Sequence, residues 1–389
     1  MKLTVASVVA LIAGSAIAAP AQVQKRACSS AVRLSGTENA FLNRKLHANS
    51  FYREEVNKAA DAMSDSSLAA KARKVGDIGT FLWIDTISKI EITRPLIQDV
   101  PCEEIVGLVI YDLPGRDCAA KASNGELPVG AINRYKSEYI DPIKKMLQAL
   151  PNTAFALVIE PDSLPNLVTN IDLTSCQQSK SGYEEGVAYA LKELNLPNVV
   201  MYIDAGHGGW LGWNDNVKPG AEGLAKVYKA AGSPSQVRGI ATNVAGWNAW
   251  SKTPGEFENS PDGQWNKAHD EKRYVELFGA ALKTAGMPNH AIVDTGRNGV
   301  QGLREEWGHW CNVNGAGFGI RPSTDTGSTL TDAFVWVKPG GESDGTSDTS
   351  ANRYDSFCGH SDAFKPSPEA GQWHQAYFEM LVKNANPAL

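Results

Sequence analysis

Acidic side chains recur where apolar runs of the sequence end. Asp85, Asp117, Asp162, Asp204 and Asp294 each close or shortly follow a run rich in Val, Ile or aromatic residues. One such carboxylate is more often the cap of the next helix than a catalytic group. Several on one rim are different, because neighbouring negative charges raise at least one pKa and leave a carboxylic acid able to donate a proton near neutral pH. The pattern therefore predicts acid catalysis.

Tryptophans stand close to these carboxylates. Trp83 lies in one apolar run, Trp210 and Trp213 follow Asp204 in a glycine-rich segment, and Trp310 lies between two later runs. Sugar rings pack their C–H faces on indole while their hydroxyl groups bond to polar side chains. Flat aromatic groups among carboxylates therefore predict a carbohydrate ligand.

The motifs of several other reactions are missing. The sequence has no G-x-x-x-x-G-K-[ST] or G-x-S-x-G motif, and the glycines of residues 315–319 have the wrong spacing for a dinucleotide fingerprint. The seven histidines show no metal-binding spacing, and residues 343–348 lack the terminal glutamate of a calcium loop. We therefore expect neither a metal nor a cofactor.

Seven short apolar runs must position these residues. Their length and their Val, Ile and aromatic content are typical of strands, and their unbroken apolarity suits a parallel sheet covered on both faces. The carboxyl ends of such strands, where the acidic residues fall, are the usual ligand site. The runs span residues 81–85, 106–111, 154–160, 198–203, 237–243, 290–294 and 332–338.

Helical patterns alternate with these runs. Tyr274, Phe278 and Leu282 recur at intervals of four residues and mark one apolar helical face. Similar patterns occur near residues 133–149, 184–195 and 373–383. The alternation predicts an α/β protein, and seven parallel strands most simply close into a distorted TIM-like barrel. An open, doubly wound sheet is the alternative.

The N-terminus has the features of a secreted protein. Residues 1–18 combine Lys2, an apolar stretch and a small-residue cleavage pattern, which predicts a signal peptide. A dibasic pair ends residues 19–26, which we interpret as a propeptide. Residues 27–389 then form one catalytic domain, without a linker or a second module. No other apolar run approaches the ~18 residues that span a bilayer, so we expect an extracellular protein without a membrane anchor.

Charge and cysteine content bound the partners. The chain has 37 basic and 43 acidic residues, a formal net charge of −6, and no long basic run. This balance argues against nucleic acid or an anionic membrane as the main partner, and we expect a monomer. Six cysteines in an oxidising compartment predict disulfides, although their spacing leaves the pairing open.

Longer blocks of sequence carry a more specific signal. They are YDLP-x-RDCAA (111–120), VIEPDSL (158–164), DAGH and GWLGW (204–213), ATNVA (241–245), WCNV (310–313), GFGIRP (317–322) and VWVKPGGE (335–342). In this order, over about residues 81–389, the chain resembles the family 6 glycoside hydrolases of fungi, of the cellobiohydrolase II type. The resemblance implies a barrel of seven parallel strands that hydrolyses β-1,4-glucan with inversion and releases cellobiose from non-reducing ends.

The resemblance also implies individual roles. Asp162 matches the general acid, and Asp117 matches the carboxylate that raises the pKa of that acid and accepts the proton of the attacking water through a water chain. Ser123 matches a residue that holds this water chain, and Tyr111 one that helps distort the sugar. The supporting polar residues are Arg116 and Asp204. The sugar-binding positions are Trp83, Asp85, His207, Trp210, Trp213, Asn243, Trp310, Lys338, Glu342 and Asp344, the last also a candidate base.

The same resemblance bears on the cysteines. It implies the disulfides Cys118–Cys176 and Cys311–Cys358, each stapling one of two loops that cover an active-site tunnel. Cys28 and Cys102 remain, and we expect them to pair and tie the N-terminus to the barrel.

Two alternatives differ in the openness of the site or in its chemistry. The segment from Gly340 to Gly371, one of the covering loops, has full length, which favours exo-acting cellobiohydrolase activity. A more open cleft would give an endo-acting β-1,4-glucanase of the same family. A non-catalytic glucan-binding protein is disfavoured, because such a protein does not need both Asp162 and Asp117. Without a carbohydrate-binding module, we expect weaker adsorption to crystalline cellulose.

Overall fold

One parallel sheet of eight strands organises the molecule. The computed structural model describes residues 27–389, and the predicted signal peptide 1–18 and propeptide 19–26 lie outside the described residues. The strands follow the order β1-β3-β4-β5-β6-β7-β8, with β2 also paired to β3. Their bounds are β1 Lys45–Leu46, β2 Leu82–Ile84, β3 Glu104–Ile110, β4 Ala154–Ile159, β5 Val199–Asp204, β6 Val237–Thr242, β7 His290–Asp294 and β8 Thr331–Val335.

The predicted seven-stranded barrel, β2 to β8, is confirmed, and it is nearly closed. Every neighbouring pair along it runs parallel. Across the gap between β2 and β8, the Phe81 N–H donates to the Trp336 carbonyl at 3.0 Å and Trp83 Nε1 donates to the Val337 carbonyl at 2.8 Å. The predicted run 332–338 therefore extends beyond β8, because its last residues bond to the β2 segment. β1, of two residues, is too short for a sequence pattern to predict.

The central strands are buried on both faces, as their unbroken apolarity predicted. Inside the barrel, alternate side chains such as Val109, Val158 and Val200 pack against one another. The side chains between them, such as Leu108 and Leu157, point outward and pack beneath the helices. Two apolar layers thus hold the strand ends in place.

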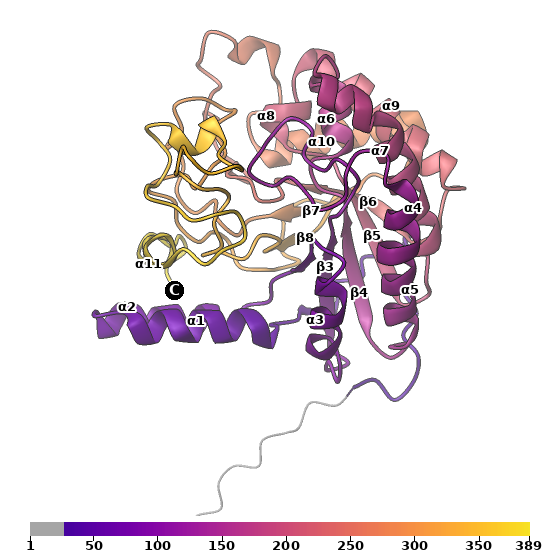
Figure 1. Cartoon of the computed structure of the whole chain (residues 1–389), viewed down its shortest axis with the longest axis horizontal. Helices are drawn as coiled ribbons and strands as arrows, with labels where there is room; N and C mark the ends of the chain where they lie inside the picture. Colours follow the sequence, from indigo (N-terminus) through magenta and orange to yellow (C-terminus); the bar gives the residue numbers. More distant parts are fainter. Residues whose placement is uncertain (1–26) are drawn as a thin grey trace, which may run out of the picture.

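Helices α5, α7 and α9 lie along one side of the sheet (Figure 1). α10 shows why its sequence folds as predicted: Asp270 caps it by accepting the Arg273 N–H at 2.9 Å, and Gly286, with φ of 81°, ends it. The other predicted helical patterns correspond to α4 with η1 and α5, to α7 and to α11. The helices are α1 Ser50–Ala62, α2 Ser66–Val75, α3 Lys89–Leu96, α4 Ile132–Arg134, η1 Tyr135–Ile140, α5 Asp141–Gln148, α6 Leu164–Thr169, α7 Thr174–Glu193, α8 Gly208–Leu211, α9 Asn214–Ala230, η2 Gly263–Trp265, α10 Glu271–Ala285, η3 Ser356–Gly359 and α11 Gln375–Lys383.

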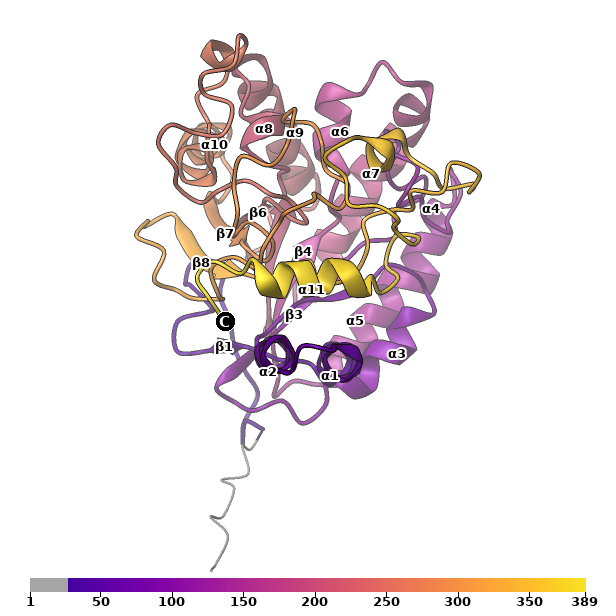
Figure 2. The same cartoon turned by 90° about the vertical axis from the view of Figure 1, so that its left-hand side faces the viewer.

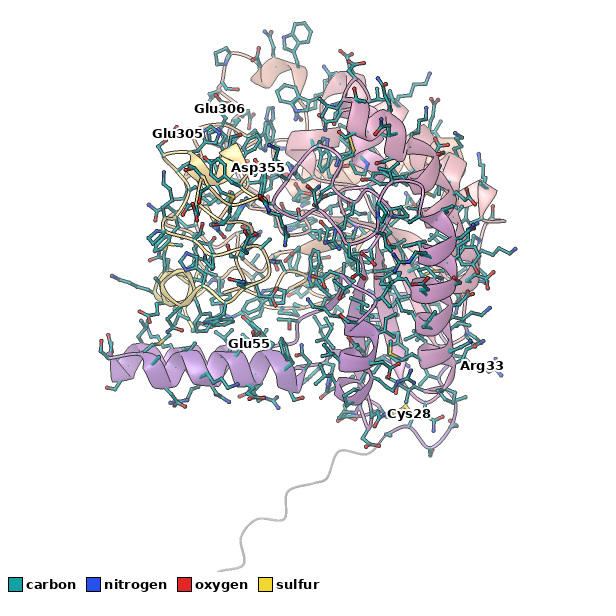
Figure 3. All side chains as sticks on the ribbon, in the orientation of Figure 1. Cys28, Arg33, Glu55, Glu305, Glu306 and Asp355 are labelled. Atoms are coloured by element: carbon teal, nitrogen blue, oxygen red, sulfur yellow. A yellow bond between two sulfur atoms is a disulfide. The ribbon has the colours of Figure 1, made fainter. Side chains whose placement is uncertain are left out.

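A third apolar layer joins the ends of the described chain. α1, α2 and α11 lie side by side (Figure 2), and Val56, Ala72 and Tyr377 are buried between them and the segments that precede α11. Residues 295–330 and 336–374, which have little regular structure, rise from this layer beside the barrel; Figure 3 labels Glu305, Glu306 and Asp355 in this part.

Three disulfides fasten the structure, with the expected pairs Cys28–Cys102, Cys118–Cys176 and Cys311–Cys358. The first ties the beginning of the described chain to the segment before β3. The other two hold irregular segments near the carboxyl ends of the strands. Within residues 27–389, no helix is both long and apolar enough to cross a membrane.

Candidate active site

Hydrogen bonds tie the turn after β4, which carries Asp162, to Asp204 at the end of β5. The Asp162 N–H donates to Asp204 Oδ2 at 3.1 Å, and the Gly206 N–H donates to the same oxygen at 3.3 Å. Asp162 has a φ of 58° and Glu160 a φ of 48°, in the left-handed region that other residues than glycine seldom adopt. Such backbone strain persists only where surrounding contacts impose it. Asp204 therefore fixes the strained turn that presents Asp162.

Asp117 lies beyond the end of β3 and is held by two hydroxyl groups. Tyr111 Oη donates to Asp117 Oδ2 at 2.6 Å, and Ser123 Oγ donates to the same oxygen. Asp117 is buried, and its backbone also has a positive φ of 55°. The predicted partners Tyr111, Asp117 and Ser123 thus form one hydrogen-bonded group.

Burial and repulsion between negative charges change the pKa values of the carboxyl groups in this cluster. Burial raises the pKa of Asp162 well above its usual value, and the charges of Asp117, Asp204 and Asp344 raise it further. Burial also raises the pKa of Asp204 to about 7. It raises the pKa of Asp117 too, against the opposing effect of the Ser123 and Tyr111 hydrogen bonds. Burial and the neighbouring negative charges therefore both favour the protonated form of Asp162.

Arg116 supports the backbone around the acids. Its guanidinium donates to the carbonyls of Ser123 at 2.9 Å, Asp85 at 2.8 Å and Tyr111 at 2.5 Å, and lies 4.2 Å from the centre of the Tyr111 ring. Within residues 27–389, none of the carboxylates of Asp117, Asp162 and Asp204 forms an ion pair. The hydrogen bonds to the Asp117 and Asp204 carboxylates come from neutral hydroxyl and N–H groups, which favour the ionised forms, so burial is what favours protonation here.

Asp344 has a different environment. Arg297 Nη1 lies 2.9 Å from both of its carboxylate oxygens, and the Asn312 N–H donates to Oδ2 at 2.9 Å. The Arg297 guanidinium lies 4.0 Å from the centre of the Trp247 ring. This ion pair occupies both carboxylate oxygens of Asp344.

A cavity of about 410 Å³ opens beside these groups. Asp162 remains accessible from it, although protein atoms surround the carboxyl group closely. Within residues 27–389, no group of three or more His, Cys, Asp or Glu side chains is placed to hold a metal ion. The predicted site residues that line the cavity are Trp83, Asp85, Tyr111, Arg116, Asp117, Ser123, Asp162, His207, Trp210, Trp310, Lys338, Glu342 and Asp344.

Two indoles in the cavity wall are held by their N–H groups. Trp83 Nε1 bonds to the barrel backbone, and its ring meets Tyr111 edge-on with centroids 5.2 Å apart. Trp210 Nε1 donates to Thr169 Oγ1 at 2.7 Å. A Cβ at Gly206, which has a φ of 59°, would lie 3.0 Å from the Trp210 ring, so only glycine lets this ring approach. The walls thus present fixed aromatic faces.

Polar groups lie beside these rings. Lys338 Nζ is 3.4 Å from Glu342 Oε2 and 5.5 Å from the centre of the Trp83 ring. His207 Nδ1 accepts the Gly209 N–H at 3.1 Å, which places the neutral ring's proton on Nε2. Burial lowers the pKa of His207 to about 3, so it is a neutral donor. Sugar hydroxyl groups would find both donors and acceptors here.

The comparisons with known proteins agree with this geometry. The family model described as glycosyl hydrolases family 6 matches residues 41–385. The chain belongs to this family.

Relatives extend over the whole chain. The 1,4-β-D-glucan cellobiohydrolase CEL6C of Podospora anserina is 64% identical over 397 residues, covering 100% of both chains. The catalytic core domain of the cellobiohydrolase Cel6A from Chaetomium thermophilum is 51% identical with a TM-score of 0.85, covering 90% of this chain and 99% of that one. Cellobiohydrolase II from Humicola insolens, in complex with glucose and cellotetraose, is 48% identical with a TM-score of 0.86, covering 90% and 100%.

Three predicted site residues of this family 6 chain do not line the cavity. Asp204 acts through the Asp162 backbone. Asn243 is fully buried, and its amide donates to the carbonyls of Asn248 at 3.2 Å and Asp294 at 2.9 Å, so it supports the turn after β6. Trp213 lies behind the wall, with its ring 5.8 Å from that of Trp307.

Sequence reasoning missed other groups of the wall. Trp307 packs between the Phe257 and His269 rings, at 5.4 and 5.8 Å, and Trp247 lies under Arg297. Both tryptophans stand in irregular segments beside polar residues, which is the signal that singled out Trp310. The other missed wall residues include Lys89, Asn166, Asn170, Arg304, His309, Arg353 and Phe357.

Proposed function

We propose that this glycoside hydrolase acts on cellulose, cleaves β-1,4-glucan with inversion and releases cellobiose from non-reducing chain ends. The observation that carries the proposal is the place of Asp162 at the cavity wall, where burial and the charges of Asp117, Asp204 and Asp344 raise its pKa. The cellobiohydrolases among its relatives support the substrate. The cello-oligosaccharide bound in the Humicola insolens structure supports it as well.

Asp162 is the general acid of the proposed reaction. Its proton passes to the glycosidic oxygen as the bond to the leaving sugar breaks. Inversion requires a water molecule on the opposite face of the sugar ring, with the two carboxyl groups about 6.5–9.5 Å apart. The strained turn and the Asp204 contact orient the Asp162 carboxyl group for this transfer.

Asp117 accepts the proton that the attacking water loses, through a chain of water that Ser123 helps to hold. Its carboxylate is oriented by Tyr111 and Ser123 on one oxygen, which leaves the other oxygen free of these two bonds. As the water is deprotonated, the negative charge beside Asp162 diminishes. The repulsion by Asp117, which raises the pKa of Asp162, therefore weakens as Asp117 takes up the proton.

Asp344 binds sugar hydroxyl groups in this proposal and is not the base. Both of its oxygens are engaged by Arg297, and Oδ2 also accepts the Asn312 N–H, so neither oxygen is left free for the attacking water. Lys338, Glu342 and His207 Nε2 supply further hydrogen bonds, while Trp83, Trp210 and Trp310 form the aromatic platforms.

The covering segments favour exo action over endo action. Residues 116–125 and 343–371, which the disulfides of Cys118 and Cys358 fasten, both contribute to the cavity wall. A glucan chain enclosed between them enters by its end. A mobile or open cover would give the endoglucanase alternative.

The remaining proposals concern the setting of the enzyme. Three disulfides and the sequence of residues 1–18 support an extracellular enzyme released by a signal peptide. The net charge of −6 supports a partner other than nucleic acid or an anionic membrane. We propose that it acts as a monomer.

Proton NMR of cellohexaose hydrolysis tests the function. Product lengths and anomers are followed together in the first minutes, with Asp162→Ala as the control for contaminating cellulases. We expect cellobiose as the main early product, in the α-anomeric form. Early β-anomer, or wild-type activity of Asp162→Ala, would overturn the proposal, whereas α-anomeric products of mixed length would favour the endoglucanase.

A further inference from the structure

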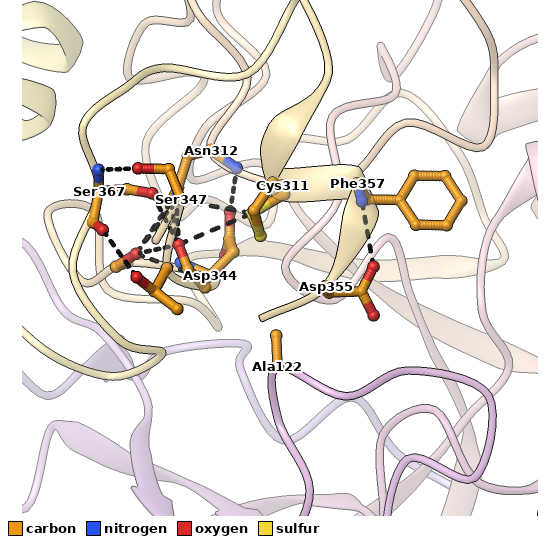
Figure 4. The surroundings of a disulfide bond; sticks show 12 residues. Ala122, Cys311, Asn312, Asp344, Ser347, Asp355, Phe357 and Ser367 are labelled. Atoms are coloured by element: carbon orange, nitrogen blue, oxygen red, sulfur yellow. Dashed lines mark hydrogen bonds between the residues drawn. A yellow bond between two sulfur atoms is a disulfide. The ribbon is translucent and has the colours of Figure 1, made fainter. Parts of the chain in front are cut away.

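Two segments that cover the cavity touch each other across it. Residues 121–123 belong to the loop after β3, and residues 353–355 belong to the irregular segment after β8. The Lys121 N–H donates to Asp355 Oδ2 at 2.9 Å, and Arg353 Nη2 donates to the Ala122 carbonyl. Figure 4 shows Ala122 opposite Cys311 and Asp355, which lie on two segments that the Cys311–Cys358 disulfide joins.

Ala122 is seated firmly in this contact. It is fully buried, although both of its neighbours in the sequence are more exposed. A Cβ added at Gly345 would lie 2.8 Å from the Ala122 Cβ and 2.7 Å from Cys358 Sγ. Ala122 and the Cys311–Cys358 disulfide therefore leave no room for a side chain at residue 345, and the three groups pack closely.

Asp355 is built into its own segment as well as into the contact. Its Oδ1 accepts the Phe357 N–H at 3.1 Å and so caps η3, while Oδ2 reaches across to Lys121. The side chain is 7% exposed. A carboxylate that bonds two backbone N–H groups at once holds both with charge-assisted strength.

The contact adjoins the catalytic group. Ser123 follows Ala122 directly, and its Oγ donates to Asp117 Oδ2. The Ser123 carbonyl accepts from Arg116 Nε at 2.9 Å, so the backbone of Ser123 is held as well as its side chain. The position of residues 121 and 122 thus determines whether Ser123 reaches Asp117.

We propose that Asp355 and Arg353 are positioning residues, which hold residues 121–123 so that Ser123 stays bonded to Asp117. This inference deepens the proposed function and rests on it, because hydrolysis is the readout. The pair is separated from Ser123 by more than two hundred positions in the sequence. Asp355 acts through its bond to Lys121, whereas Arg353 also lines the cavity, and its charge opposes the rise in the Asp117 pKa that burial causes.

A double-mutant cycle tests the proposal. Asp355→Ala, Ser123→Ala and the double variant are compared with wild type by kcat and KM on cellohexaose, with the unfolding temperature of each. We expect Asp355→Ala to lower kcat at least about tenfold, with KM changed less than about threefold, because Ser123 then no longer holds Asp117. In the Ser123→Ala background, the same change should cost about twofold or less.

Asp348→Ala is the matched control. Asp348 lies in the same segment and is exposed, and among the described residues its carboxylate bonds only to Ser350. The kcat of Asp348→Ala should therefore equal that of wild type. Asp355→Asn keeps the side-chain size and one acceptor, and we expect a smaller loss with the same dependence on Ser123. It takes the place of the alanine variant if that variant does not fold.

The outcomes separate this proposal from the proposed function. The positioning role would be overturned if Asp355→Ala lowered kcat equally in the wild-type and Ser123→Ala backgrounds, or if kcat were unchanged in both Asp355 variants. In either case, hydrolysis by the wild-type protein would still uphold the proposed function. Wild-type protein that leaves cellohexaose intact would overturn the function itself.

Discussion

Buried aspartates occur at both ends of the barrel strands, and they have different partners. Near the amino ends, Asp332 receives two bonds of 2.9 Å from the Arg238 guanidinium and one of 2.8 Å from Tyr202 Oη. At the carboxyl ends, the Asp162 N–H after β4 donates to the carboxylate of Asp204 at the end of β5, and within the described part of the chain neither aspartate forms an ion pair. The first aspartate is paired with a cation, whereas burial and neighbouring negative charges raise the pKa values of the acids in the second group.

This difference shows what makes a buried carboxyl group reactive. A buried ion pair is locked, since breaking it leaves one charge without compensation. A buried acid that repels its neighbours keeps a proton which it can donate. The comparison therefore leads to opposite expectations for the two ends: substitutions near the amino ends should change stability, and substitutions near the carboxyl ends should change rate.

The largest effect should come from Asp162→Ala. We expect cellohexaose hydrolysis to fall by about 10³–10⁴-fold, because proton donation by a positioned acid contributes on this order. The unfolding temperature should stay the same or rise, since a repelled buried acid is removed. Chromatography of the products and a thermal melt measure both; a variant that loses stability together with activity would contradict the comparison.

Arg238→Met should have the opposite profile. Removing the cation leaves Asp332 buried and unpaired, which we expect to cost about 3–5 kcal/mol of unfolding free energy. Urea denaturation measures this loss. At temperatures where the variant is folded, kcat should remain within about twofold of wild type. A stable variant with lowered kcat would break the comparison.

Asp117→Asn should lower the rate and also shift its pH dependence. We expect kcat to fall by about 100-fold. Burial is the main cause of the raised Asp162 pKa, and the Asp117 charge is the next. Without that charge the acid loses its proton at lower pH, so the alkaline limb of the kcat profile should move toward lower pH. An alkaline limb that stays in place would show that the two carboxyl groups are not coupled.

Asp204→Asn should produce the smallest effect, a gain in stability. The folded-state pKa is raised to about 7, above the ordinary value of about 3.9, so the folded protein retains a proton that the unfolded chain releases. The contribution to stability is thus fully present below about pH 4 and is lost as pH rises toward 7. The variant should be more stable than wild type by about 1–2 kcal/mol at pH 7, with a smaller difference at pH 4. Urea denaturation at both pH values decides this; a loss at pH 7 would contradict it.

The positions of the two acids could be predicted because they depend on local features. An apolar run marks a strand, and parallel strands bring their carboxyl ends to one edge, so the segments that carry Asp117 and Asp162 begin at the same edge. The final place of Asp117, beyond the end of β3, also depends on its bonds to Tyr111 and Ser123. The direction in which a side chain turns at that edge could not be predicted. Asn243 also follows a strand, yet its amide is consumed by two backbone carbonyls.

Contacts between irregular segments were beyond the reach of sequence patterns. Arg353 and Ala122 are 231 positions apart and neither lies in a helix or strand, so no periodicity connects them. The wall tryptophan Trp307 carries the sequence signal that singled out Trp310, but its packing could not be predicted. Its place depends on how Phe257 and His269, on a separate segment, fold against it.

The central claim, that Asp162 donates the proton, is tested most directly with two substrates that differ in their leaving group. Cellohexaose needs protonation of the departing oxygen, whereas β-cellobiosyl fluoride releases fluoride, which needs little help from an acid. We expect Asp162→Ala to lose about 10³–10⁴-fold of kcat/KM on cellohexaose and less than about tenfold on the fluoride. Equal losses on both substrates would contradict the assignment of Asp162 as the acid.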